Sequence, residues 1–120
     1  MADAALFVGF GQPARAREPQ ALEVWEEAVR LYTELKDTGA IESFEPVLLE
    51  PHGGDLGGFF LIRGDREQID RLRAHEQFRR INTRAGLVVD GLGVIEAYIG
   101  FALAAELAVY REQMERQLSA

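Results

Sequence analysis

Two consecutive strand–helix–strand units set the fold class expected of this chain. The first unit has its strand, helix and strand at Ala4–Phe10, Pro19–Asp37 and Ile41–Leu49. The second unit has them at Gly58–Arg63, Arg66–Ala85 and Leu87–Tyr98. This order predicts an α+β domain of the split-βαβ, ferredoxin-like type, βαββαβ, spanning residues 1–120.

The residues of the four predicted strands indicate where each strand lies in the sheet. The first and third strands are apolar at successive positions, which is typical of strands covered on both faces. The second and fourth contain acidic residues and fit the edges. Right-handed crossovers then predict the order fourth, first, third, second (4-1-3-2), with both helices on one face. Asp90-Gly91 and Gly93 predict a bulge or a sharp bend inside the fourth strand.

Terminal residues and apolar spacing define the two helices. Pro19 suits the start of the first helix, and its predicted buried face comprises Leu22, Trp25, Val29 and Tyr32. The second helix begins with a capping-box pattern, Asp65 with Gln68. Its apolar residues then change face, so we expect a break near Ala74-His75. Its interleaved arginines and carboxylates are typical of a solvated, ion-paired surface.

The second face of the predicted sheet has no helix to cover it. Residues 101–118 form a C-terminal helix, with apolar helical spacing over Ala102–Leu118. This helix alone could shield the sheet in a monomer. A second copy would shield it more fully, so we expect a homodimer through the sheet faces, with the helix on its own or on the partner domain.

Charge and composition exclude several classes of protein. The net charge is −7, and residues 1–60 hold the whole acidic excess, which argues against nucleic-acid binding. No apolar run is long enough for a membrane span, and the first residues do not resemble a signal peptide. The chain has no cysteine, which excludes disulfides and favours a cytoplasmic location.

Four segments resemble a family of small uncharacterised bacterial proteins: Ile41–Leu49, Pro51–Asp55, Gly58–Asp65 and Leu87–Val94. That family is similar to the dimeric α/β-barrel superfamily, which includes antibiotic-biosynthesis monooxygenases, muconolactone-isomerase-like proteins and stress-responsive barrel proteins. The resemblance implies a dimeric α/β barrel with a cleft between sheet and helices. It supplies no catalytic residue that can be placed on this sequence.

Aromatic residues and one histidine are the candidates for a site in that cleft. Trp25, Tyr32 and Phe60 are predicted to bind a small hydrophobic ligand, although aromatic residues at such spacing are more often core. Arg63 ends a central strand and faces either the cleft or the dimer interface. His75 lies at the predicted helix break, where it could transfer a proton or simply cap a helix.

The remaining motifs are better explained by loops than by ligands. Gly9–Ala14 matches a loose dinucleotide pattern, but the helix starts too late to follow the glycines. Arg15 and Arg17 could bind an anion but are more typical of a solvated loop. His52 and Asp55 lie in a turn-rich loop without convincing ligand spacing. We therefore predict no cofactor and no metal site.

Two main functions remain open from the sequence. The first is a small-ligand-binding or assembly module without a catalytic motif. The alternative is a cofactor-independent oxygenase or isomerase that acts on a hydrophobic cyclic compound, with His75 as proton shuttle. A third hypothesis is a protein-interaction subunit that uses the acidic first helix.

Overall fold

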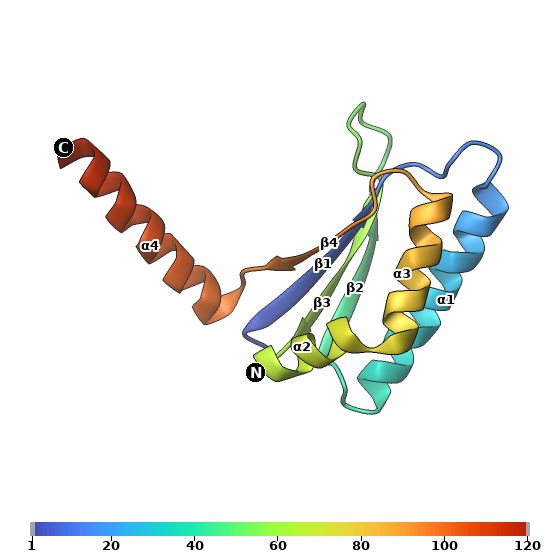
Figure 1. Cartoon of the computed structure of the whole chain (residues 1–120), viewed down its shortest axis with the longest axis horizontal. Helices are drawn as coiled ribbons and strands as arrows, with labels where there is room; N and C mark the ends of the chain where they lie inside the picture. The colour runs from blue at the N-terminus through green and yellow to red at the C-terminus, as the bar shows by residue number, and fades with distance from the viewer. Residues whose placement is uncertain (1, 120) are drawn as a thin grey trace.

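The computed structural model describes residues 2–119 and shows one four-stranded sheet with four helices (Figure 1). The strands are β1 (Ala4–Phe10), β2 (Ser43–Leu48), β3 (Gly58–Gly64) and β4 (Gly93–Ala97). The helices are α1 (Glu18–Asp37), α2 (Arg66–Ala74), α3 (Glu76–Val88) and α4 (Gly100–Ser119).

The sheet has the predicted ferredoxin-like strand order, β2-β3-β1-β4, and every neighbouring pair is antiparallel. The two apolar strands, β1 and β3, lie in the centre, as their composition indicates. Helices α1, α2 and α3 lie on one face of the sheet (Figure 1). Arg84 of α3 binds both carboxylate oxygens of Glu27 on α1, and this ion pair lowers the pKa of Glu27.

The predicted break in the second helix is confirmed at His75. Helix α2 begins with a complete capping box, in which Gln68 N donates to the Asp65 carboxylate at 2.8 Å. The chain then becomes extended at His75, whose Nδ1 accepts from the backbone N–H of Phe78 at 3.4 Å and caps α3. Ile69 and Phe78 would lie on different faces of one straight helix, and the break lets both reach the core.

The boundary between α3 and β4 differs from the prediction. Leu87 and Val88 belong to α3, and β4 begins only at Gly93. The run Leu87-Val88-Val89 has the composition of a strand, but Val88 continues the helical spacing of Phe78, Ile81 and Ala85 and packs against the core. Asp90 and Gly91 form a sharp bend, one of the two predicted alternatives, but the bend lies before β4 rather than inside it, and Gly91 adopts a positive φ of 63°.

The buried face of α1 is also rotated from the predicted one. Leu22 is 59% exposed, whereas Trp25 and Val29 are only partly buried beside the core. The buried residues of α1 are Val24, Ala28, Leu31, Tyr32 and Leu35. Both sets have helical spacing, so periodicity alone could not choose between them.

The face of the sheet opposite the helices is open and apolar at its centre. Leu6, Val8, Phe60 and Ile62 point into the core, so the residues between them point the other way. This open face carries Phe7, Val47, Phe59, Leu61 and Ile95. The rings of Phe7 and Phe59 lie 5.1 Å apart between centroids, and Ile95 is 63% exposed.

Helix α4 leaves the domain after β4 and extends away from it (Figure 1). A monomer would need α4 to cover the open face of its own sheet, and α4 does not do so. Its large apolar side chains are exposed: Phe101, Leu103, Leu107, Val109, Tyr110, Met114 and Leu118. Among residues 2–119, α4 included, no helix combines the length and the apolarity that crossing a bilayer requires.

Candidate functional site: an apolar cavity between sheet and helices

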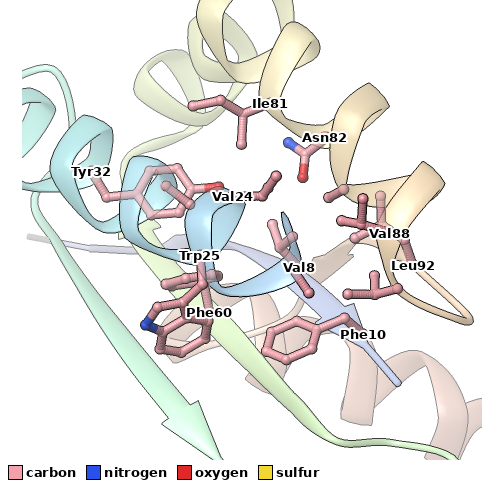
Figure 2. A pocket seen from close by; sticks show the side chains of 14 residues that line it. Val8, Phe10, Val24, Trp25, Tyr32, Phe60, Ile81, Asn82, Val88 and Leu92 are labelled. Atoms are coloured by element: carbon pink, nitrogen blue, oxygen red, sulfur yellow. The ribbon is translucent and has the colours of Figure 1, made fainter. Parts of the chain in front are cut away.

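A cavity of about 50 Å³ lies between the helix-covered face of the sheet and helices α1 and α3 (Figure 2). No charged residue lines it. The lining residues are Val8, Phe10, Ala21, Val24, Trp25, Ala28, Tyr32, Phe60, Ile81, Asn82, Ala85, Val88, Val89 and Leu92. The cavity has room for a few water-sized groups, well below the ~300 Å³ at which sites for drug-sized ligands begin.

The Tyr32 hydroxyl is an unusual group within this apolar surface. Tyr32 is 0% exposed, and its ring lies 5.0 Å from Phe60 between centroids. Among the described residues no atom hydrogen-bonds to its hydroxyl. Figure 2 shows this hydroxyl pointing into the pocket, with the amide of Asn82 on the other side. A buried hydroxyl without a partner costs about 1–3 kcal/mol, so its retention needs an explanation.

Burial also keeps this phenol protonated. Desolvation raises the pKa of Tyr32 well above its usual value of about 10, and the Asn82 amide, which lies close to the hydroxyl but outside hydrogen-bond geometry, offsets the rise only in part. The Asn82 Nδ2 itself donates to the carbonyl oxygen of Phe78 at 2.9 Å, which anchors the amide to α3. The Tyr32 hydroxyl can therefore donate a hydrogen bond at any pH near neutrality.

We expect Tyr32→Phe to raise the free energy of unfolding by about 1 kcal/mol, because it removes an unsatisfied buried hydroxyl and keeps the ring. Thermal melting at pH 7 measures this change. The raised pKa also predicts a pH dependence. Above a pH of about 10 the tyrosine ionises in the unfolded chain but not in the folded one, so the wild type loses stability there. Tyr32→Phe lacks this part of the loss. Tyr98→Phe, at a half-exposed tyrosine, is the control, and a less stable Tyr32→Phe would contradict the expectation.

A wider groove adjoins the cavity at the N-terminal end of α1. The groove measures about 350 Å³ and is lined by the α1 start, the residues after β1 and the β2–β3 loop. Four residues line both spaces and so form the wall between them: Phe10, Ala21, Trp25 and Val89. Phe10 and Trp25 meet edge to face at 5.6 Å, and Trp25 lies 4.6 Å from Phe60.

Of the predicted ligand-binding residues, the structure brings together Trp25, Tyr32 and Phe60, which all line the cavity. Arg63 lies elsewhere. It alternates with the core residue Ile62 and so lies on the open face, where its guanidinium is 3.7 Å from the Glu45 carboxylate. Of the two places open to Arg63 from the sequence, the cleft and the dimer interface, the cleft does not include it, and the interface stays a prediction.

The structure does not place His75 at the cavity. Its imidazole caps α3 and lines a separate pocket of about 110 Å³ with Leu72 and Gln68, and Trp25 does not line that pocket. The catalytic role of His75 therefore stays a prediction. The contact that the structure shows is the N-terminal cap of α3.

Local packing explains the glycine and histidine motifs in the loops. A Cβ at Gly11 would lie 2.8 Å from the carbonyl oxygen of Asp90 and 2.9 Å from that of Asp55, so only glycine allows these loops to meet. His52 bonds within its own turn, with Nε2 2.8 Å from the carbonyl oxygen of Leu56. Within residues 2–119 no three metal-ligating side chains cluster together.

Sequence reasoning missed Phe10 and Asn82 as site residues. Asn82 follows Phe78 by four positions and so shares the apolar face of α3. A polar side chain on a core-facing stripe is a recognisable signal. Phe10 gave no comparable signal, because its position at the end of β1 looks like ordinary core.

The comparisons with known proteins concern the fold. No protein-family model matches the chain, and no curated protein does either. Solved structures do match. A dimeric ferredoxin-like protein of unknown function from Jannaschia sp. CCS1 is 15% identical, with a TM-score of 0.61 over 80% of this chain and 99% of that one.

Two further similar structures are of proteins whose names state an activity. A putative antibiotic biosynthesis monooxygenase from Chloroflexus aurantiacus is 9% identical, with a TM-score of 0.53 over 81% of this chain and 93% of that one. SnoaB, a cofactor-independent oxygenase from Streptomyces nogalater, is 15% identical, with a TM-score of 0.54 over 82% of this chain and 94% of that one. These likenesses support the predicted ferredoxin-like fold.

Proposed function

We propose that this protein is a homodimer that binds a small, largely apolar molecule between its sheet and its helices α1 and α3. One observation supports ligand binding: among residues 2–119 the buried Tyr32 hydroxyl has no hydrogen-bond partner, and no charged residue lines its cavity. A cavity serving only packing would be more stable with phenylalanine at this position. A bound molecule that hydrogen-bonds to Tyr32 explains why the hydroxyl is there.

The homodimer rests on two apolar surfaces that a single chain leaves uncovered. One is the open sheet face around Phe7, Phe59 and Ile95, and the other is the exposed apolar side of α4. A two-fold pair of chains can cover both, with sheet against sheet and each α4 lying on its partner. A helix of this length spans about 30 Å, comparable to the width of a small domain. Similar structures such as the Jannaschia protein are themselves dimeric.

The ligand-binding half can be tested through Trp25, which lines the cavity and is the only tryptophan of the chain. We expect p-xylene to change the Trp25 fluorescence saturably in the wild-type protein. Ala85→Leu fills the cavity from α3 and should abolish this change, because no space remains there for the inner end of the probe.

The matched control is Ala74→Leu, at an exposed residue of α2, which should titrate like the wild type. Circular dichroism checks that both variants are folded. A wild-type signal that does not saturate, or one that Ala85→Leu leaves unchanged, would mean that the probe does not occupy this cavity.

A cofactor-independent oxygenase reaction is the second candidate. The similarity of fold to SnoaB and the apolar lining of the cavity favour it. In such an enzyme Tyr32 and Asn82 would be the polar groups nearest the substrate, because His75 lies outside the cavity. The predicted role of His75 as proton shuttle would then require the substrate to reach the pocket beside α2.

A further inference from the structure

We propose that the ligand is a neutral molecule with an apolar body and one terminal hydroxyl or carbonyl group, and that this group enters past Phe10 and Trp25 to hydrogen-bond with Tyr32. The proposal rests on the ligand-binding function proposed above. It adds the chemical class of the ligand, its orientation and its way in.

The lining of the cavity determines the charge of the ligand. No lysine, arginine or histidine lines it, and neither does an aspartate or glutamate. A carboxylate or ammonium group entering this space would lose its hydration without gaining an opposite charge, at a cost of several kcal/mol. A neutral polar group loses less and recovers a hydrogen bond from Tyr32.

The position of Tyr32 determines the orientation. Its hydroxyl is a fully buried polar atom that lacks a hydrogen-bond partner among residues 2–119, whereas the Asn82 Nδ2 already donates to the carbonyl oxygen of Phe78. A ligand with its polar group outward would leave the hydroxyl unsatisfied and gain nothing from it. The polar end of the ligand therefore points inward, and the apolar body points toward the wall of the cavity.

The wall between cavity and groove provides the way in. Phe10 and Trp25 line both spaces and meet edge to face. In the proposed entry path, a rotation of the Phe10 side chain joins the two spaces. The cavity alone, at about 50 Å³, holds the polar end of a ligand, whereas the groove of about 350 Å³ can hold its body. Leu22 and Leu49 line the groove and offer apolar contact there. This assignment gives the exposed Leu22 a function that its helix position alone does not explain.

Three probes that differ in one substituent test the chemical class: 4-methylphenol, p-xylene and 4-methylbenzoate. We expect the wild-type protein to bind 4-methylphenol roughly three- to tenfold more tightly than p-xylene, because one neutral hydrogen bond contributes about 0.5–1.5 kcal/mol. We expect no saturable binding of 4-methylbenzoate at pH 7. Calorimetric titration of the full-length protein measures all three.

Two variants separate the parts of the proposal. Tyr32→Phe should reduce the preference for 4-methylphenol over p-xylene to about one while leaving p-xylene affinity unchanged, and Tyr98→Phe should keep the preference. Phe10→Ala should speed the association of 4-methylphenol in stopped-flow measurements of Trp25 fluorescence, because it removes part of the wall.

The outcomes also distinguish this proposal from the one it rests on. Equal affinities for 4-methylphenol and p-xylene in the wild type, or a preference that survives Tyr32→Phe, would overturn the assigned chemistry and leave a ligand-binding cavity. Tight binding of 4-methylbenzoate would overturn the neutral class. If none of the probes binds saturably, both proposals fail.

Discussion

Ile95→Asp should convert the protein from a two-chain to a one-chain species in light scattering at micromolar concentration. Ile95 lies on the open face opposite Phe7 and is 63% exposed in a single chain, so the change should hardly affect folding itself. In the proposed dimer the new carboxylate would be buried without a partner, which costs about 3–5 kcal/mol. That cost weakens association by roughly two to four orders of magnitude.

Leu87→Asp is the matched control. Leu87 is 73% exposed, also apolar, and lies on α3 on the opposite side of the molecule from the open face. The control should remain a dimer. A wild-type protein with the mass of one chain would refute the dimer, and a dimeric Ile95→Asp would show that pairing uses another surface.

Phe60→Ala should lower the free energy of unfolding by about 3–5 kcal/mol, the range for large-to-small changes at buried aromatic positions. Phe60 is 4% exposed and contacts the rings of Trp25, Tyr32 and Phe10. Its loss would leave these three rings without the surface on which they pack. Urea unfolding followed by circular dichroism measures the change.

The comparison is best made in the single-chain Ile95→Asp background, so that folding is separated from association. Phe101→Ala is the control, since Phe101 is a phenylalanine of α4 with its side chain in solvent in one chain. It should change stability by less than about 0.5 kcal/mol. A loss of less than about 1 kcal/mol for Phe60→Ala would mean that the ring cluster is not a central part of the core.

The strand order was predictable because it depends on the polarity of the residues in each strand and on the handedness of the crossovers. Apolar residues at successive positions in Ala4–Phe10 and Gly58–Gly64 put β1 and β3 in the centre of the sheet. The handedness of the crossovers then left one arrangement. The helix break at His75 was predictable for the same kind of reason, since a straight helix cannot bury Ile69 and Phe78 on one face.

The site was only partly predictable, because lining a cavity depends on contacts between distant segments. Trp25, Tyr32 and Phe60 were identified by residue type, and three-dimensional packing does bring them together. His75 was assigned to the same cleft by its place along the chain, and Arg63 was left open between the cleft and the dimer interface. Backbone geometry instead makes His75 a helix cap, and strand alternation puts Arg63 on the open face.

Local chemistry along the chain therefore determines the element order, the central strands, the helix break and the shortage of cover on one sheet face. Which stripe of α1 is buried, where α3 ends and which groups share the cavity follow only from the packed structure. The reason is that several stripes and boundaries satisfy the same periodicity, and only the fit of α1 and α3 against β1 and β3 selects one. The unpartnered Tyr32 hydroxyl, on which the proposed function depends, belongs to this second group.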